Sequence, residues 1–94
     1  MTKPIKKFVT ESISASLLKV GTTLETQGKI HQALTPYLKL IGHYPDSSEA
    51  PIAVERVLSI TESLRNAGHY HVVMAVLDRL ERAFQTGQQE VEKA

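Results

Sequence analysis

The sequence predicts an all-α fold in which four helices form two antiparallel helical hairpins. Three observations lead to this prediction. Apolar residues recur every three or four positions along four separate segments, the spacing that gathers them on one face of a helix. Each segment ends at or near a glycine (Gly28, Gly42, Gly68 and Gly87), a residue that accepts the left-handed conformation found at many helix ends. The pattern of the first two segments returns in weaker form 40 residues later.

The first predicted helix spans 11–27. Thr10 is a suitable N-cap, Gly28 ends the segment, and the apolar face consists of Ile13, Leu17, Val20 and Leu24. The preceding residues, 1–9, carry three lysines and are predicted to form a flexible basic lead-in. They are not expected to anchor the chain to a membrane, because a lysine contributes only about 1 kcal/mol at an anionic surface.

The second predicted helix spans 29–43 and contains Pro36. A proline inside a helix removes one backbone hydrogen bond and costs about 3 kcal/mol unless the helix accommodates it. The apolar spacing continues across Pro36 without a break, which favours one helix with a kink. Two short turns separated at Thr35 are the alternative.

The third and fourth predicted helices span 48–67 and 69–86. Ser47 or Ser48 can cap the third helix, because a serine hydroxyl accepts a hydrogen bond from one of the first free backbone N–H groups. The glycine that follows the fourth helix is predicted to stop it. The polar tail beyond that glycine, 88–94, is predicted to fray.

Composition narrows the class of protein. The chain has 94 residues, 41% of them hydrophobic and 22% charged, which suits one small globular domain. Its net charge of +1 and the lack of a basic cluster beyond the first residues argue against nucleic-acid binding. No apolar run approaches the roughly 18–20 residues that span a membrane. No apolar stretch of signal-peptide length follows the start, so we expect a cytoplasmic protein without a membrane span.

Catalytic and metal chemistry is not expected. The absence of cysteine excludes a disulfide, a thiolate metal site and a cysteine nucleophile. Besides carboxylates, the plausible metal ligands are His31, His43, His69 and His71. His69 and His71 are two positions apart, so their side chains diverge if they lie on a regular helix. No phosphate-binding glycine loop or nucleophile motif is present. We therefore expect no enzyme activity, no cofactor and no metal site.

The two hairpins align without gaps at the 40-residue offset. Equivalent positions are Gly21 and Thr61, Gly28 and Gly68, Ala33 and Val73, Tyr37 and Leu77, and Leu40 and Leu80. The two small residues Gly21 and Ala33 are predicted to let the first two helices approach closely. Leu17, Leu24 and Tyr37 would then fill the space around them.

This pattern resembles the tetratricopeptide repeat family, whose helix pairs recur about every 34 residues. The resemblance places repeat units at 14–47 and 48–87 within a domain over 10–87, and it implies that the hairpins stack as a short right-handed superhelix. The first unit carries most of the family pattern, including Pro45, whereas the second departs from it at Thr61 and lacks a closing proline. An unrelated four-helix bundle is the competing fold.

In this family the first helix of each pair lines a concave groove that receives a peptide or a helix of a partner protein. The resemblance therefore implies a non-enzymatic protein–protein interaction module or scaffold. Its groove would be lined by Leu18, Thr22, Glu25, Glu55, Leu58, Glu62 and Arg65. Leu18 and Thr22 stand where some members carry the lysine and asparagine that clamp a C-terminal carboxylate, so that ligand is disfavoured. A plain solvated face is the other interpretation of these residues.

A self-associating helical bundle with a structural or regulatory role is the alternative function. Two repeats are few for a stack, since about three are usually needed for stability. An exposed end built from Val72, Val76 and Phe84 would be adhesive. We therefore expect the chain to form a homo-oligomer or to be a segment of a longer array.

Overall fold

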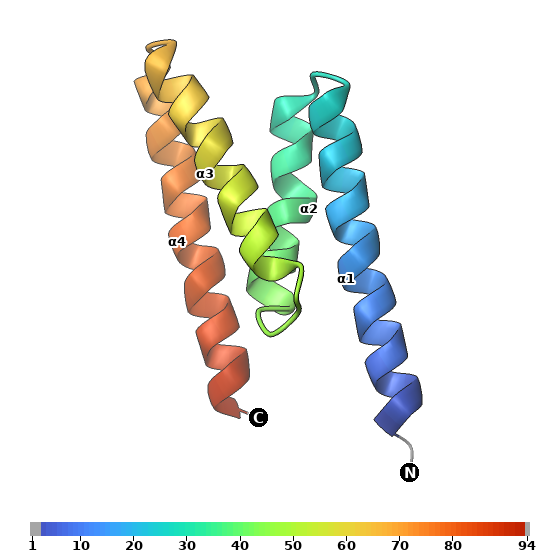
Figure 1. The fold of residues 1–94 in the computed structure, drawn as a ribbon. Coiled ribbons are helices and arrows are strands. Elements are labelled where there is room, and N and C mark those ends of the chain that lie inside the picture. Colours follow the sequence, from blue (N-terminus) through green and yellow to red (C-terminus); the bar gives the residue numbers. More distant parts are fainter. Residues whose placement is uncertain (1–2, 94) are drawn as a thin grey trace.

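The computed structural model describes residues 3–93, with the side chains of 5–88, and shows an all-α fold. Its four helices are α1 (Lys3–Thr26), α2 (Ile30–His43), α3 (Ala50–Asn66) and α4 (Tyr70–Lys93), and there is no strand within this range. Consecutive helices run antiparallel and lie side by side, with α1 and α4 at the two edges (Figure 1). The predicted pair of helical hairpins is confirmed.

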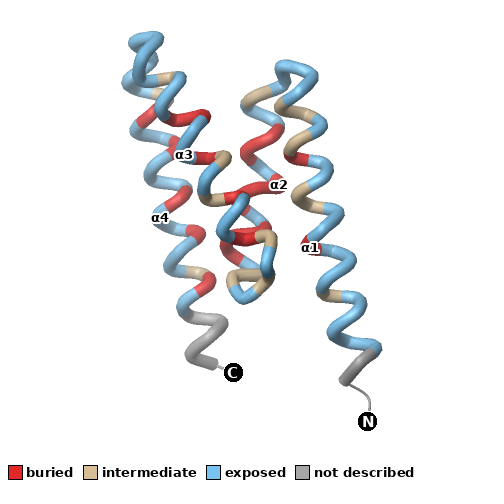
Figure 2. The backbone as a smooth tube through the Cα atoms, in the orientation of Figure 1, coloured by how far each residue is buried: buried red, intermediate tan, exposed pale blue. Residues whose placement is uncertain are grey.

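The hydrophobic core is centred on α2. This helix packs against each of the other three helices, and its buried stretch lies in the middle of the molecule (Figure 2). The completely or almost completely buried side chains of α2 are Ala33, Leu34, Tyr37 and Leu40; α3 and α4 add Ala53, Val57, Ile60, Val76, Leu80 and Ala83. The leucines of α1 that reach this core are only partly buried, namely Leu17, Leu18 and Leu24. Helix α1 is therefore an edge helix with most of its surface open.

Helix α1 begins at Lys3, eight positions before the predicted start at residue 11. The prediction of a flexible lead-in over 1–9 was wrong for 3–9, while residues 1–2 lie outside the described part of the chain. Thr10 is not an N-cap, because it lies inside α1, where its carbonyl accepts a 3.0 Å hydrogen bond from the Ser14 hydroxyl. Pro4 lies in the first turn of α1, where the missing N–H has no helical acceptor to lose.

Helix α4 continues through Gly87 to Lys93, so the predicted stop at this glycine was wrong. A Cβ at residue 87 would lie 3.2 Å from the carbonyl oxygen of Ile41 and from the Cβ of Pro45. Gly87 thus permits α4 to pass close to the end of α2. The predicted tail over 88–94 is helical as far as residue 93, and residue 94 lies outside the described range.

Pro36 is a buried residue inside the single helix α2, so the alternative of two short turns was wrong. The connection to α3 takes up residues 44–49, and α3 begins at Ala50, two positions after its predicted start. The N-cap of α3 is Glu49, with no side-chain capping hydrogen bond, so the predicted cap at Ser47 or Ser48 was wrong. Ser47 instead closes the turn that precedes the helix. Its hydroxyl accepts a 3.2 Å hydrogen bond from the N–H of Ala50 and donates a 2.7 Å hydrogen bond to the carbonyl of Tyr44.

Both hairpins turn at a glycine in the left-handed conformation, as the repeat predicts. Gly28 has a φ of 81° and Gly68 a φ of 85°. At the first turn, the N–H of Lys29 donates to the Leu24 carbonyl (2.9 Å) and that of Gly28 to the Glu25 carbonyl (3.0 Å). The second turn repeats both hydrogen bonds at positions 40 residues later. This pair of hydrogen bonds is the Schellman motif, which satisfies carbonyls at a helix end.

Replacing Gly28 by alanine is expected to destabilise the protein by about 1–2 kcal/mol, because an L-residue is strained in the left-handed region. No other atom lies within 4 Å of the new Cβ, so the cost is that of the backbone alone. Asparagine tolerates this conformation better, and Gly28→Asn should lose less. Urea unfolding of both variants checks the order. An alanine variant as stable as the wild type would contradict it.

Gly21 of α1 lies directly against the ring of Tyr37 of α2. A Cβ at residue 21 would be only 2.5 Å from Cε1 of that ring. The predicted close approach at Gly21 is confirmed, and the ring of Tyr37 fills the space beside it, as predicted. The second hairpin does not reproduce this contact, since the equivalent of Tyr37, Leu77, is 42% exposed.

Candidate functional site

The residues predicted to line one groove occupy different faces in the structure. Thr22 and Glu25 of α1 border a shallow hollow of about 310 Å³, which Arg56 of α3 closes on its other side. Leu58 lies two positions after Arg56, about 200° around the helix at 3.6 residues per turn. It therefore projects from nearly the opposite side of α3. The structure brings the α1 members together with Arg56 and leaves Leu58 elsewhere.

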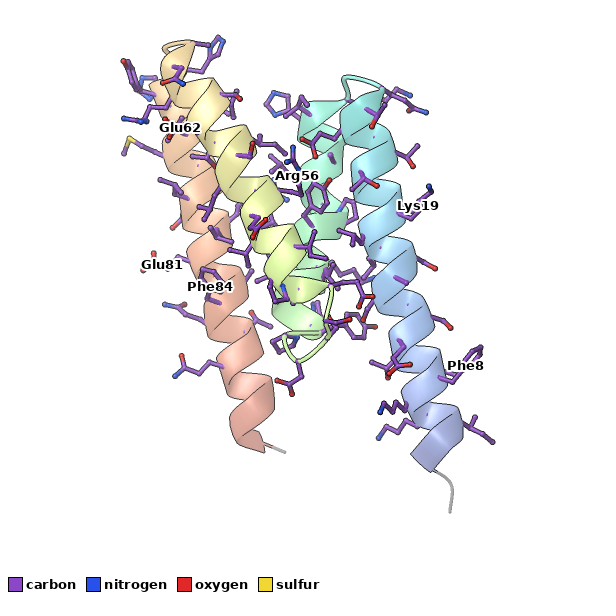
Figure 3. The ribbon with its side chains drawn as sticks, viewed as in Figure 1. Phe8, Lys19, Arg56, Glu62, Glu81 and Phe84 are labelled. Carbon is purple, nitrogen blue, oxygen red and sulfur yellow. The ribbon has the colours of Figure 1, made fainter. Side chains whose placement is uncertain are left out.

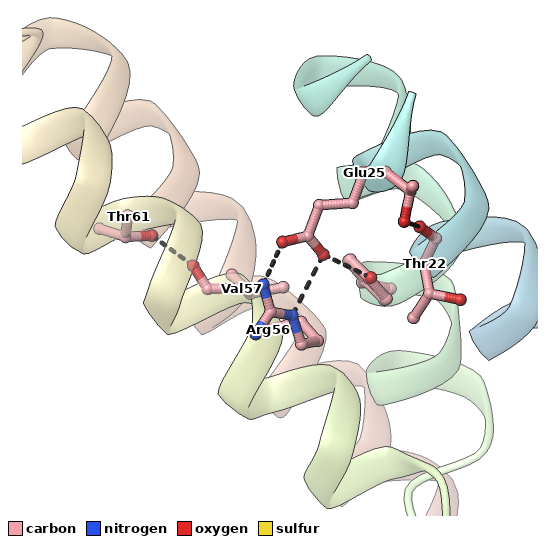
Figure 4. A network of polar contacts seen from close by, with 7 residues as sticks. Thr22, Glu25, Arg56, Val57 and Thr61 are labelled. Atoms are coloured by element: carbon pink, nitrogen blue, oxygen red, sulfur yellow. Dashed lines mark hydrogen bonds and ion pairs between the residues drawn. The ribbon is translucent and has the colours of Figure 1, made fainter. Parts of the chain in front are cut away.

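A polar network of Glu25, Tyr37 and Arg56 joins three helices (Figure 4). The Tyr37 hydroxyl donates a 2.7 Å hydrogen bond to Oε1 of Glu25. The Nε of Arg56 donates to the same oxygen at 3.1 Å, and its Nη2 forms an ion pair with Oε2. Only 17% of the Glu25 side chain is exposed, against 39% for Arg56. Both oxygens of the Glu25 carboxylate are therefore bonded to side chains of the same protein.

The network shifts the pKa values of its members. The hydrogen bond from Arg56 is the main reason that the pKa of Glu25 falls below its ordinary value of 4.5, while burial opposes the shift. Burial and the hydrogen bond to Glu25 raise the pKa of Tyr37 to about 12. The same ion pair raises the pKa of Arg56. These shifts favour a charged Glu25–Arg56 pair and a neutral Tyr37 phenol at neutral pH, and the three side chains link α1, α2 and α3.

The other predicted groove residues lie at the margins of this hollow or away from it. Leu18 is half-buried against the core. Glu62 forms an exposed ion pair with Arg65 one turn later, with 2.7 Å between the charged atoms. Glu55 and Leu58 are exposed on α3. The sequence analysis did not identify Arg56 as a site residue. Its sequence position, one turn before the apolar Ile60 in a segment of polar and apolar residues, gave little indication of this role.

An apolar cleft opens between α3 and α4. Its volume is about 380 Å³. Pro51 and Val54 of α3 form one wall, and Phe84 of α4 forms the other; the remaining lining is Ile41, Pro45, Ala50, Gly87 and Gln88. Phe84 is 48% exposed, as the predicted adhesive end requires, but Val76 is only 3% exposed and belongs to the core. Val72 is partly buried against the core.

The wall of this cleft continues as an apolar row along α4. Tyr70, Leu77 and Phe84 follow one another at intervals of seven, the spacing that stacks side chains on one helix face. Together with Met74 they remain 42% to 69% exposed. Glu81 lies among them, one turn after Leu77, and is drawn on the outer side of α4 in Figure 3. The interval of seven was visible in the sequence and could have identified this row.

A larger, polar hollow of about 590 Å³ lies between the first half of α1 and the 44–49 connection. The α1 side is formed by Lys7, Thr10, Glu11 and Ser14. Lys7 and Glu11 face each other at 4.0 Å, and both are well exposed. An exposed pair of this kind contributes little to stability or binding. The buried Ser14 hydroxyl already donates to the Thr10 carbonyl, so the lining leaves no unsatisfied buried polar side chain for a ligand.

Among the described residues, no group of three or more histidine and acidic side chains is placed to hold a metal ion. No described helix combines the length and apolar character needed to cross a membrane.

Comparisons with protein-family models, curated proteins and solved structures gave no match. The candidate sites of this chain consequently rest on its own geometry. Among them, the cleft between α3 and α4 combines exposed large apolar side chains with a concave shape.

Proposed function

We propose that this chain is a non-enzymatic protein–protein interaction module of tetratricopeptide-like helical hairpins that binds a peptide or helix of a partner protein. The observation that carries the proposal is the cleft of Pro51, Val54 and Phe84, where a half-exposed aromatic ring stands over an apolar hollow. Cytoplasmic location is part of the same proposal.

The cleft between α3 and α4 is a better docking surface than the groove expected from the family resemblance. In that groove, Glu25 is occupied by Arg56 and Tyr37, and a ligand would have to displace both. The α3–α4 cleft has no such internal competitor. Aromatic side chains in a partly enclosed apolar setting supply much of the binding energy of protein interfaces.

The shape of the cleft suits an elongated ligand. Two antiparallel helices border it, and the apolar row of α4 extends it toward Tyr70. Amphipathic helices bind such surfaces through apolar residues spaced three, four and seven positions apart. We therefore propose a helix or extended peptide with an apolar face as the ligand class.

The test compares the proteins retained by wild type and by Phe84→Glu, with Gln85→Glu as the matched control. The control adds the same charge one position away, about 100° around the helix. Phe84→Glu should lose the retained partner and Gln85→Glu should keep it. Both positions are exposed, so circular dichroism should show unchanged helix content. A Phe84→Glu variant that retains every partner would refute this docking surface.

A further inference from the structure

We propose that the cleft and apolar row of α3 and α4 bind the outer face of α1 from a second copy of this chain, which gives a head-to-tail assembly. The inference rests on the proposed function, because it uses the same docking surface and names its occupant. Four observations support it: the composition of the α1 face, the charges around both surfaces, the packing inside one copy, and the apolar area.

The outer face of α1 is an apolar row without a partner in the described structure. Ile5, Phe8, Val9, Ile13 and Val20 are between 37% and 73% exposed. Steps of three, four and seven residues keep them on one side of the helix. Figure 3 shows Phe8 pointing away from the rest of the molecule. This row has the pattern of an amphipathic helix that binds an apolar groove.

The charges beside the two apolar surfaces are opposite. Lys6 and Lys19 flank the α1 row, about 60–80° around the helix from its centre, and both are exposed. Glu81 lies within the α4 row, and Glu55 lies on the exposed side of α3. No ion pair joins any of these four side chains to another side chain in the part of the chain that the structure describes. A carboxylate inside an apolar row favours a partner that brings a cation.

The packing of the two hairpins within one copy indicates how a hairpin of a second copy would pack on α4. Leu34 and Ile41 of the first hairpin are 1% and 3% exposed, within the core that the two hairpins share. At the 40-residue offset these positions become Met74, which is 69% exposed, and Glu81. The second hairpin therefore presents an equivalent but uncovered surface. A neutral apolar hairpin would leave Glu81 buried without a partner, whereas α1 supplies lysines.

The apolar area is sufficient for a weak but specific interface. If a large side chain offers about 200 Å² when fully exposed, each surface presents roughly 500 Å² of apolar area. Two such surfaces together reach about 1,000 Å², the lower end of specific protein interfaces. We therefore expect reversible association that depends on concentration.

The two surfaces lie at opposite edges of the molecule, since α1 and α4 are the outer helices (Figure 1). A copy that covers the α4 surface of its neighbour still exposes its own. Contacts of this type do not close unless the rotation between copies makes a ring. The average mass of the wild type should consequently rise with concentration beyond that of a dimer.

The experiment uses two charge variants and their mixture in analytical ultracentrifugation. Val9→Glu disrupts the α1 row and Phe84→Glu disrupts the α4 surface. Each variant alone should associate at least about tenfold more weakly than wild type, as expected for a loss of about 1.4 kcal/mol. The mixture should form a 1:1 dimer, because one intact surface of each kind remains and neither copy can extend further.

A matched control and the opposing outcomes complete the design. Gln85→Glu on α4, about 100° around the helix from Phe84, should associate as wild type does. A wild type that stays monomeric at high concentration would overturn the inference, and so would a mixture without dimers. Self-association of Val9→Glu at wild-type strength would indicate a two-fold contact instead. None of these results would affect Phe84-dependent binding of a different protein, so the proposed function is tested separately.

Discussion

Replacing Gly21 by alanine is expected to destabilise the protein by up to about 2 kcal/mol. The new Cβ would lie 2.5 to 2.9 Å from three ring atoms of Tyr37. That ring has no room to retreat, because the residue is fully buried and its hydroxyl is bonded to Glu25. Overpacking of this kind costs about 1–3 kcal/mol, and the better helix propensity of alanine returns only about 1 kcal/mol. Chemical unfolding with urea measures the difference.

Gly42→Ala provides the matched control for this prediction. A Cβ at residue 42 would lie 3.5 Å or more from the atoms of Ala83, which is ordinary contact. This variant should therefore equal or exceed the wild type in stability. Tyr37→Leu should rescue Gly21→Ala, since it removes the ring atoms that clash. If the alanine at residue 21 costs the same in both backgrounds, the tyrosine ring is not the cause.

The turns of the hairpins were predictable because their chemistry is local. A glycine after an apolar segment often marks a left-handed helix end, since only glycine adopts this conformation without strain. Gly28 and Gly68 both form such ends, with matching hydrogen bonds. The same rule failed at Gly87, where the helix continues. There the absence of a Cβ makes room for Pro45 and Ile41, which are distant in sequence. The local sequence around Gly87 does not reveal this contact.

The beginning of α1 was missed for a different reason. Residues 3–9 form helix, but the side chains of 5–9 are all exposed, so their apolar residues do not mark a face packed against the core. Ile5, Phe8 and Val9 are all exposed. The sequence offered Pro4 as a sign of a helix start, since proline is favoured in a first turn. A basic composition suggested a flexible lead-in instead.

Part of the candidate site could be predicted from residue spacing in the sequence, and part depends on contacts between distant residues. The exposed row of Tyr70, Leu77 and Phe84 has a regular interval and could be read from the sequence. Arg56 could not, because its partner Glu25 lies 31 positions away and the pairing depends on where α3 sits relative to α1. Glu25 itself was predicted to face a ligand. The structure shows it facing Arg56 because α2 brings Tyr37 between the two helices.

Arg56→Met is expected to destabilise the protein by about 1–2 kcal/mol. Methionine keeps the apolar stem, so the loss reports the two hydrogen bonds to a mostly buried carboxylate. Arg65→Met is the matched control, because it breaks an ion pair whose side chains are 57% and 58% exposed. Exposed pairs of this type contribute only about 0.2–1 kcal/mol. Equal losses for the two variants would show that the Glu25 network has no special weight.

The pH dependence of unfolding separates the network's charge from its packing. Because Arg56 lowers the pKa of Glu25 below 4.5, the network stabilises the fold above that pH and its contribution is lost as the pH falls through the lowered pKa. Arg56→Met should lose less stability on acidification than wild type.

At alkaline pH the titrating group of the network is Tyr37, whose pKa is raised from 10.0 to about 12. Stability present below pH 10 should therefore decline as the pH rises toward 12, and Tyr37→Phe should remove that decline together with a late phenolate absorbance. A Tyr37→Phe variant with the same alkaline profile as wild type would contradict the buried hydrogen bond that joins α1 to α2.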